Sequence, residues 1–360
     1  MMEDGSLDLY FYAESSIIKK CFNQSKNKIK NTQDDFEVKK MQLNQVVVPI
    51  LISFAISVIL CPIIIPFLHK LKFGQYIREE GPKSHQKKAG TPTMGGLIFV
   101  CSVTLTSLLY LGKYKEVIPM LFVTLGFGLI GFLDDYIKVV MKRNLGLKAW
   151  QKMLGQLIIA VIFTCYLMFY SDIGTDTLIP FYGYIHMPAY IFAPFVVFVM
   201  LGTVNGVNLT DGLDGLATSV TVIVATFFTV VAVGMHVNIS PVTCAVVGSL
   251  LGFLLYNVYP AKVFMGDTGS LALGGFVVSA AFMLKMPWVI VIVGFIYLME
   301  TVSVMLQVSY FKLTHGKRLF KMAPIHHHFE ECGWSETRIV AVFSTITALL
   351  CLVALMGIKF

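Results

Sequence analysis

Charge is scarce in this sequence. Only 14% of its 360 residues are Asp, Glu, Lys or Arg, whereas 56% are hydrophobic, and the mean hydropathy is +0.75. A soluble domain usually carries about 25% charged residues. The composition therefore excludes an ordinary soluble globular domain and indicates a chain that lies in a lipid bilayer.

Cysteine pairs are also lacking. Seven cysteines occur, but no two of them form a C-x-x-C pair. A thiol inside an apolar stretch behaves as a small hydrophobic group, and this applies to Cys61, Cys101, Cys165, Cys244 and Cys351. We therefore expect neither disulfides nor structural zinc. A cleavable signal peptide is not expected either, because the first long apolar run begins only near residue 46.

Long apolar runs, by contrast, recur along the whole chain. A helix needs about 20 apolar residues to cross a hydrocarbon core of roughly 30 Å. Ten segments approach this length: 46–68, 94–111, 117–133, 154–170, 188–204, 216–233, 241–256, 271–284, 288–311 and 339–356. The sequence therefore predicts an all-α, polytopic integral membrane protein with about ten transmembrane helices.

Lys and Arg are distributed unevenly over the loops between these segments. Loops that follow the first, third, fifth, seventh and ninth segments carry 17 of them, whereas the opposite loops and the C-terminus carry 4. Basic residues gather in the cytoplasmic loops of membrane proteins. The odd-numbered loops are therefore predicted to be cytoplasmic, and both termini to lie on the extracytoplasmic side.

Residues 1–45 fit this topology less well, because their seven lysines would lie on the extracytoplasmic side. Even when these lysines are added to the opposite loops, the odd-numbered loops keep the majority. We interpret residues 1–45 as a polar N-terminal extension, as an interfacial segment, or as a consequence of start-site choice, since Met41 could begin the chain.

The polar residues near the apolar segments collect at one set of segment ends. Asp134 and Asp135 end the third segment in "GFLDDYIK". The stretches "TVNGVNLTDGLDG" and "YNVYPAKVFMGDTGS" follow the fifth and seventh segments and contain Asn205, Asn208, Asp211, Asp214, Asn257 and Asp267. Other odd-numbered loops supply Lys88, Thr93, His326, His327 and His328. One membrane face is thus predicted to carry carboxylates, amides, lysines and imidazoles within reach of each other.

Each of these motifs has a simpler explanation when taken alone. Aspartates and glycine-rich turns often cap helices, and basic loops often only fix topology. These explanations do not account for the convergence on one face. Carboxylate and amide oxygens without cysteine suit Mg²⁺ or Mn²⁺, and lysines beside them would neutralise phosphate charge. The sequence therefore favours a metal-assisted site for a phosphorylated substrate, which could be a lipid.

The histidine triplet in "PIHHHFEECGW" leaves two interpretations open. Consecutive side chains point about 100° apart on a helix and alternate on a strand, so three in a row do not readily hold one ion. Imidazole N–H groups that donate to phosphate oxygens fit better, with "GKRLFKMAP" upstream adding positive charge. The alternative is a polar loop that histidine hydrogen bonds hold in place.

Together these motifs resemble the polyprenyl-phosphate N-acetylhexosamine-1-phosphate transferases. The matching stretches are "SHQKKAGTPTMGG", "GFLDDYIKV", "NGVNLTDGLDGLA", "YNVYPAKVFMGDTGSLALGG" and "GKRLFKMAPIHHHFE". The "APIHHHFE" stretch is similar to the branch that transfers phospho-N-acetylmuramoyl-pentapeptide rather than to the N-acetylglucosamine-1-phosphate branches. Residues 1–45 are longer than this family usually shows.

The resemblance implies a reaction and a location. UDP-N-acetylmuramoyl-pentapeptide and undecaprenyl phosphate would give lipid I and UMP, with Mg²⁺, in peptidoglycan biosynthesis. Residues 46–360 would form a single transmembrane catalytic domain in the bacterial inner membrane, with the active site on the cytoplasmic face. The resemblance also implies a homodimer, and we expect no nucleic-acid partner.

The resemblance also assigns roles to individual residues. Asp267 would be the Mg²⁺ ligand, Asp134 the candidate base towards the lipid phosphate, and Asp135 the partner of Asp134. The residues that would bind substrate are Lys88, Thr93, Lys138, Lys152, Asn208, Asp211, Asp214, Asn257, His326, His327 and His328. A phosphate monoester has a second pKa of about 6, so direct attack needs no strong base. A two-step route with an aspartate nucleophile stays open.

A proton-coupled transporter is the alternative from a different class. Glu300 lies midway along segment 288–311, and acidic residues inside spans can mark proton pathways. A transporter concentrates such groups near the bilayer midplane, whereas the other carboxylates here are predicted to lie at one surface. We therefore favour the transferase and assign Glu300 to packing or to supporting the site from behind.

Overall fold

A computed structural model gives the structure of the protein over residues 44–70, 90–141 and 146–358. The chain divides into two compact units, Met1–Val47 and Val48–Phe360, and the architecture below is that of the second unit, apart from residues 44–47 at the start of the first helix. Residues 1–43 and Lys88 lie outside the described ranges. What the sequence predicts for the N-terminal segment and for this lysine therefore stays a prediction.

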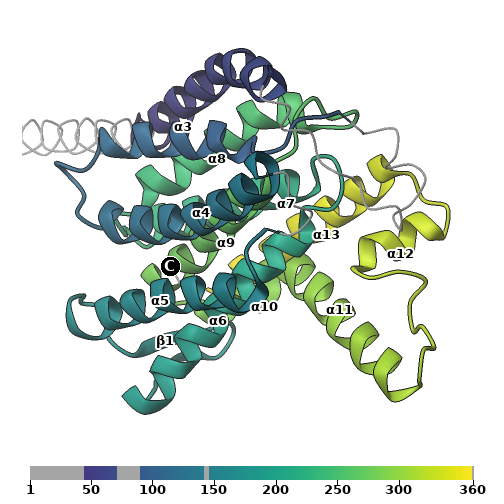
Figure 1. Cartoon of the computed structure of the whole chain (residues 1–360). Coiled ribbons are helices and arrows are strands. Elements are labelled where there is room, and N and C mark those ends of the chain that lie inside the picture. The colour runs from purple at the N-terminus through teal and green to yellow at the C-terminus, as the bar shows by residue number, and fades with distance from the viewer. Residues whose placement is uncertain (1–43, 71–89, 142–145, 359–360) are drawn as a thin grey trace, which may run out of the picture. The chain divides into compact units, whose positions relative to one another are not determined.

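Helices dominate the described ranges (Figure 1). A helix over Asn44–Lys70 comes first. The long helices that follow are α3 (Gly96–Leu108), α4 (Val117–Val140), α5 (Ala149–Phe169), α6 (Ala189–Thr210), α7 (Leu216–Gly234), α8 (Ser240–Asn257), α9 (Gly266–Met283), α11 (Phe295–Leu313) and α13 (Glu336–Met356). The short ones are η1 (Pro287–Val289), α10 (Ile290–Val293) and α12 (Ile325–Glu331). The expected helical class is confirmed, and every predicted apolar segment coincides with a helix or with a pair of helices.

The number of membrane spans is a separate matter. Among the described residues, seven helices are long and apolar enough to cross a membrane, or eight if one bent pair is counted as a single span. α3 has only 13 residues, which is short for a bilayer core, and α9 begins with the polar run "GDTGS". The chain is therefore a polytopic membrane protein, and the count of ten spans stays a prediction.

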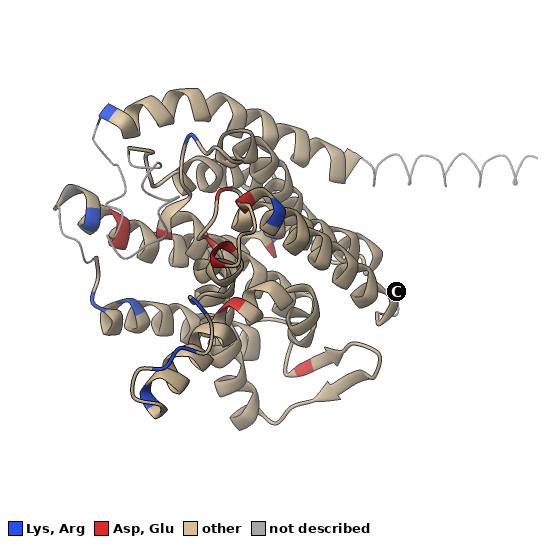
Figure 2. Cartoon of the chain, turned by 90° about the vertical axis from the view of Figure 1, so that its right-hand side faces the viewer, with Lys and Arg blue, Asp and Glu red and all other residues tan. Residues whose placement is uncertain are grey.

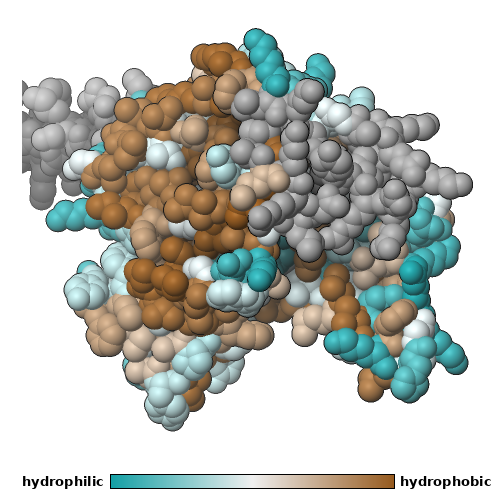
Figure 3. All heavy atoms as spheres, in the orientation of Figure 1, coloured by the Kyte–Doolittle hydropathy of each residue, from teal (hydrophilic) through white to brown (hydrophobic). Residues whose placement is uncertain are grey.

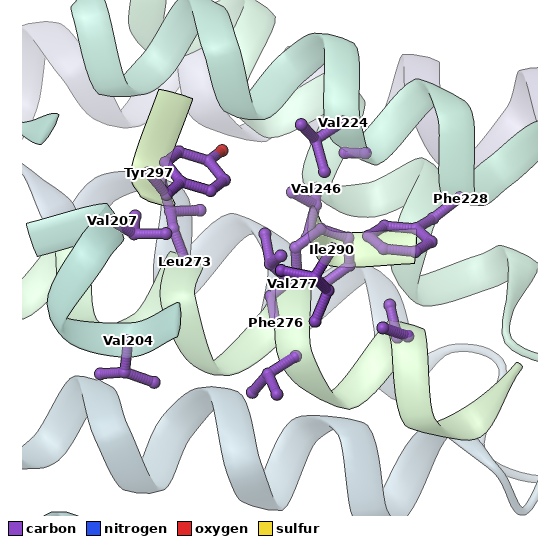
Figure 4. Packing of buried hydrophobic residues seen from close by; sticks show 14 of the residues in the cluster. Val204, Val207, Val224, Phe228, Val246, Leu273, Phe276, Val277, Ile290 and Tyr297 are labelled. Atoms are coloured by element: carbon purple, nitrogen blue, oxygen red, sulfur yellow. The ribbon is translucent and has the colours of Figure 1, made fainter. Parts of the chain in front are cut away.

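α9 lies in the interior of the helical unit. All its residues from Thr268 to Met283 are buried. Figure 4 shows Leu273, Phe276 and Val277 of this helix packed among side chains of α6, α7, α8, α10 and α11. A helix that is apolar on every side belongs in a protein interior. The backbone groups at its N-terminus must therefore find their hydrogen-bond partners largely within the protein.

Glycines let neighbouring helices approach α9 closely. Gly131 of α4 faces the first turn of α9, where an added Cβ would collide with the backbone oxygen of Asp267. Gly96 of α3 meets Gly269 of α9 in the same way. Small residues at helix crossings allow backbones to come together in membrane proteins. These glycines therefore set where α3 and α4 cross the central helix.

The ninth apolar segment is a bent pair of helices rather than one straight span. The parts before and after Gly294 form an angle of 81°. Sharp bends of this kind occur at glycine, where the chain can leave helical geometry at little steric cost. α11 turns away from the neighbouring helices (Figure 1), yet Glu300 on its second turn is fully buried.

A short antiparallel hairpin lies between α5 and α6, where the sequence had predicted only a loop. It pairs β1 (Asp176–Ile179) with β2 (Gly183–His186). The Thr177 hydroxyl accepts a hydrogen bond from Trp288 Nε1 at 3.2 Å, and the Leu178 N–H donates to the Lys285 carbonyl at 2.6 Å. Strand formation in such short runs depends on tertiary contacts, which the apolar pattern does not reveal.

The surface carries the marks of a membrane protein. Figure 3 shows a broad hydrophobic area over α3, α4, α5 and α8, where Leu105, Leu129 and Ile158 are among the exposed side chains. So large a patch on a soluble chain would promote aggregation. In Figure 2, most of the visible Lys and Arg residues lie on the side away from the hairpin. This distribution agrees with the predicted asymmetry between odd-numbered and even-numbered loops.

The close crossing of α4 and α9 gives a test of this architecture. Gly131→Ala should lower the free energy of unfolding by about 1–3 kcal/mol, because the new methyl group meets rigid backbone. The matched control is Gly202→Ala in α6, since nothing lies within 4 Å of a Cβ built there. The control should be neutral or stabilising by roughly 0.5–1 kcal/mol. Thermal unfolding in detergent measures both, and equal unfolding temperatures for the two variants would contradict the proposed crossing.

Candidate active site

Three helix ends bring a group of charged side chains together. Asp134, Asp135 and Lys138 lie in the last two turns of α4, and Lys138 forms an ion pair with Asp134 one turn before it. Lys152 lies in the first turn of α5, and Asp267 lies in the first turn of α9. These segments are far apart in sequence, and the glycine-mediated crossing of α4 over α9 brings two of them into contact.

Asp267 is the point at which α4, α5 and α6 converge. Its Oδ2 atom accepts hydrogen bonds from Lys138 Nζ at 2.9 Å and from Lys152 Nζ at 3.1 Å. Its Oδ1 atom accepts a hydrogen bond from Asn208 Nδ2 at 2.9 Å. Both oxygens of this carboxylate are therefore held by donors on three different helices, which fixes the direction in which the carboxylate points.

Asp135 caps the N-terminus of α9 from a different helix. Its Oδ1 accepts from the Asp267 N–H at 3.2 Å, and its Oδ2 accepts from the Thr268 N–H at 2.8 Å and the Thr268 hydroxyl at 2.7 Å. The first N–H groups of a helix have no partner within it, and a carboxylate there also interacts favourably with the helix dipole. Asp135 thus positions the backbone that carries Asp267.

Asp134 holds the connection between α4 and α5. Its Oδ1 accepts the Leu147 N–H at 2.8 Å, and its other oxygen contacts Lys138. A Cβ on Gly146 would touch this carboxylate, so glycine is needed where the loop passes so near. Because each oxygen of Asp134 has a donor, this side chain is oriented rather than mobile.

Thr93 and Asp211 reach the same place from the other side. Both lie next to Gly266, which has φ +74°; a Cβ on this glycine would come within 2.9 Å of Thr93 Oγ1 and 2.7 Å of Asp135 Oδ2. The Gly266 N–H hydrogen-bonds to Asp211. Burial and the neighbouring carboxylates raise the pKa of Asp211 well above its ordinary value. A bound cation would reverse that shift.

Asn257 and Asp214 contact the loop that leads into α9 rather than Asp267. Asn257 donates to the Val263 carbonyl at 3.0 Å and accepts from the Thr218 hydroxyl at 2.6 Å. Asp214 accepts from the Ala261 N–H at 2.9 Å. These contacts support the segment before Asp267, and a direct contact with substrate stays a prediction for both residues.

The three histidines lie on α12 and have three different partners. His326 is only 1% exposed, and its Nδ1 lies 3.0 Å from Oε2 of the fully buried Glu300. Its other ring nitrogen faces Gly212, where a Cβ would collide with it. His327 Nδ1 lies 2.6 Å from Glu330 Oε2, and His328 Nδ1 accepts the Lys321 N–H at 3.2 Å. The prediction that the triplet does not share one ion agrees with this geometry.

Sequence reasoning missed several side chains that complete the site. Thr268 joins Asp135, and Ser270 Oγ accepts a hydrogen bond from Asn208 at 2.7 Å. Both lie in "MGDTGS", where the sequence had predicted only Asp267 as a site residue. Gln156 was also missed, although a lone amide in the apolar segment 154–170 was a visible signal. Glu300 was noticed, but its partner His326 lies 26 residues further along the chain and no local pattern connects them.

The donor set fits a divalent cation. Asp134, Asp135 and Asp267 each place one carboxylate oxygen within 4.8 Å of the others. Burial alone would raise the pKa of Asp267. A hydrogen bond with Asp134 and the two lysine charges instead hold that pKa below its usual range, so Asp267 offers an ionised ligand. Proteins usually bind Mg²⁺ through one or two carboxylates together with the phosphate oxygens of a substrate. The aspartates offer such carboxylates, and the lysines beside them suit phosphate groups.

Comparisons with known proteins agree with this site. Residues 117–285 match the family model Glycosyl transferase family 4, and residues 88–100 match Phospho-N-acetylmuramoyl-pentapeptide-transferase signature 1. A membrane-embedded phospho-sugar transferase is therefore the class that the fold and the site define. These two matched regions contain the predicted site residues Lys88, Thr93, Asp134, Asp135, Asp211, Asp214 and Asp267.

Curated relatives identify the family within this class. A phospho-N-acetylmuramoyl-pentapeptide-transferase of Clostridium perfringens is 54% identical over 320 residues, which cover 88% of this chain and 98% of the relative. Those of Acetivibrio thermocellus (53% identity, 86% of this chain, 94% of the relative) and Clostridium beijerinckii (52%, 88% and 97%) are similar. The chain belongs to the phospho-N-acetylmuramoyl-pentapeptide-transferase family. The resemblance inferred from the motifs is thereby confirmed.

The capping role of Asp135 can be separated from a direct role in chemistry. Asp135→Asn loses the charge at the helix N-terminus and places an N–H₂ group against donors, so it should destabilise the protein by about 1–2 kcal/mol. Thr268→Val removes only the hydroxyl bond and should cost less, because both backbone N–H bonds to Asp135 remain. Thermal unfolding and turnover are measured on both. Loss of turnover in Asp135→Asn with an unchanged unfolding temperature would instead mean that Asp135 contacts metal or substrate.

The buried Glu300–His326 pair gives a second test. Glu300→Gln and His326→Gln should each destabilise the protein by about 1–3 kcal/mol, because each leaves a buried polar partner behind. The double variant should cost clearly less than the sum of the two, since residues in contact are not additive. His327→Gln on the next residue of α12 is the comparison, and it should cost less than His326→Gln, because His327 is partly exposed and its partner Glu330 lies on the same helix. A Glu300–His326 double variant that shows simple additivity would contradict the pairing.

Proposed function

We propose that this chain transfers phospho-N-acetylmuramoyl-pentapeptide from its UDP carrier to undecaprenyl phosphate, giving lipid I and UMP in peptidoglycan biosynthesis. One observation carries the proposal. A cluster of carboxylates and two lysines converges on Asp267 at the ends of membrane helices, in a chain about half identical to transferases of that name. A site in this position can meet a water-soluble nucleotide and a lipid phosphate together.

The two lysines would bind the phosphate groups. Both substrates are anionic, and bringing them together costs electrostatic energy that positive groups offset. Lys138 and Lys152 come from different helices and reach the same oxygen of Asp267. Mg²⁺, when bound by Asp267, would neutralise the diphosphate further, and Asp134 and Asp135 lie close enough to contribute carboxylate oxygens. Asn208 keeps Asp267 directed towards that position.

Direct attack by the lipid phosphate is the route that we favour. An oxygen of undecaprenyl phosphate would bond to the β-phosphorus, the bond from that phosphorus to the bridging oxygen would break, and UMP would leave with that oxygen. A phosphate monoester is mostly ionised at neutral pH because its second pKa is about 6. Asp134, with donors on both oxygens, is suited to orienting this group and has no need to extract a proton.

The remaining features of the proposal follow from charge and position. The odd-numbered loops hold most of the loop Lys and Arg residues, which supports an active site on the cytoplasmic face of the bacterial inner membrane and extracytoplasmic termini. His327 and His328 are partly exposed on α12 and would contact the sugar nucleotide, while His326 would act from the interior. We also propose that Lys88 contacts a phosphate group and that the protein assembles as a homodimer.

The closing experiment uses purified protein with undecaprenyl phosphate and one of two donors. UMP should be released from UDP-N-acetylmuramoyl-pentapeptide, in a Mg²⁺-dependent manner, and not from UDP-N-acetylglucosamine. Release from the second donor alone would assign the chain to the related N-acetylglucosamine-1-phosphate transferases. Proton-coupled flux in sealed vesicles without UMP release would favour the transporter instead.

The metal ligand is tested in the same assay. Asp267→Asn preserves shape but loses an anionic ligand, so turnover should fall by about 100-fold, since a bound metal supplies several kcal/mol of charge stabilisation. Glu116→Gln is the matched carboxylate-to-amide control, because Glu116 precedes the opposite end of α4 and contacts Asn238. Near-normal turnover and unchanged Mg²⁺ dependence in Asp267→Asn would remove Asp267 from the site.

A further inference from the structure

A buried amide lies one turn behind the site on α5. Gln156 is fully buried, and it begins the stripe of buried residues that continues through Ala160, Phe163, Thr164 and Leu167. Side chains four residues apart lie on the same face of a helix. Gln156 therefore shares a helix face with Lys152, four residues before it, whose ammonium group reaches Asp267.

The partner of Gln156 is an amide on α6. Asn205 Nδ2 donates to Gln156 Oε1 at 2.8 Å, and Gln156 Nε2 donates back to Asn205 Oδ1 at 3.4 Å. Asn205 Nδ2 also donates to the Leu201 carbonyl of its own helix at 2.8 Å. Asn205 lies three residues before Asn208, the residue that holds Oδ1 of Asp267.

The two amides thus join the two helices that hold Asp267 from opposite sides. The position of α5 determines where Lys152 lies, and Lys152 binds Oδ2 of Asp267. The position of α6 determines where Asn208 lies, and Asn208 binds Oδ1. α5 is also set against α4, because a Cβ on Gly155 would lie 3.2 Å from Ile130 and one on Gly126 would lie 2.9 Å from Ile159. The Gln156–Asn205 pair supplies the corresponding constraint towards α6.

We propose that Gln156 and Asn205 form an interhelical clasp that sets the register of α5 against α6, so that Lys152 and Asn208 meet on Asp267. The effect of the clasp on turnover rests on the proposed function, whereas its effect on the packing of α5 against α6 does not. Gln156 is fully buried, so its amide would lose its hydrogen bonds without reaching water if either helix slid or rotated, and hydrogen bonds between side chains hold membrane helices together. A lysine side chain has many rotamers. Its ammonium group therefore stays near Asp267 only if the backbone that carries it is held in place.

The clasp predicts a specific kinetic pattern. Gln156→Leu and Asn205→Leu should each lower turnover about 10-fold, since small displacements of positioning groups cost one to two orders of magnitude. In a background with Lys152→Met, adding Gln156→Leu should lower turnover by less than about 2-fold, because the clasp places α5 and Lys152 is the side chain of α5 that reaches Asp267. Thr164→Val is the matched control, since Thr164 is buried on the same helix and its hydroxyl donates to the Ala160 carbonyl of that helix at 2.7 Å.

A swapped pair separates positioning from loss of packing. Gln156→Asn combined with Asn205→Gln keeps two amides and the same total side-chain length, so it should restore turnover to within about 3-fold of the unaltered protein. The clasp would be overturned if the effects of Gln156→Leu and Lys152→Met on turnover multiplied fully and the swapped pair restored no turnover.

A structural measurement decides the clasp independently of activity. Spin labels at Met153→Cys on α5 and Phe198→Cys on α6, both exposed positions, report the distance between the helices in a background without the seven native cysteines. Gln156→Leu should shift or broaden the distance distribution, and the swap should restore it. An unchanged distribution in Gln156→Leu overturns the clasp. If the unaltered protein releases no UMP from either donor, the proposed function fails, and the distance measurement still decides the clasp.

Discussion

The capping of α9 by Asp135 is the contact on which the rest of the site depends. α9 is buried along almost its whole length, so its first N–H groups need acceptors from the protein. Asp135 supplies both of its oxygens from α4. Because Asp134 is the preceding residue and Lys138 lies about one turn after Asp135, the bond that satisfies the start of α9 also brings these side chains to Asp267.

This arrangement concentrates negative charge in a partly buried place. Asp134, Asp135, Asp211 and Asp267 lie close together, and only Lys138 and Lys152 balance them among the described side chains that contact Asp267. Like charges at such distances oppose folding, and natural proteins accept such costs mainly at functional sites. The imbalance makes the site receptive to a cation, and a cation beside lysines makes it receptive to phosphate.

Two polar pairs, one of them fully buried and the other with one buried member, connect the helices around this centre. Gln156 with Asn205 joins α5 to α6, and Glu300 with His326 joins α11 to α12. Apolar contacts between membrane helices are tolerant of sliding, because lipid is as apolar as the helix surfaces. A polar pair with at least one buried member is less tolerant, since a buried group that is displaced finds no water. The two pairs therefore fix the helices that carry Lys152, Asn208 and the histidines.

The amino-acid sequence by itself determined the class of the protein, its helical segments and the groups of polar residues that form the site. Apolar length and composition are local properties, so the helices could be located without knowing how they pack. The convergence of "LDD", "NLTDGLDG" and "GDTGS" could be inferred because all of them follow odd-numbered segments. Only the tertiary structure decided which partner each side chain takes. Asp135 became a cap for α9, Asn257 a support for the loop before it, and His326 the buried partner of Glu300. The hairpin after α5 and the bend at Gly294 were decided in the same way. In each case the outcome depends on which distant segment lies opposite a residue, and the periodicity of a single segment carries no information about its neighbours.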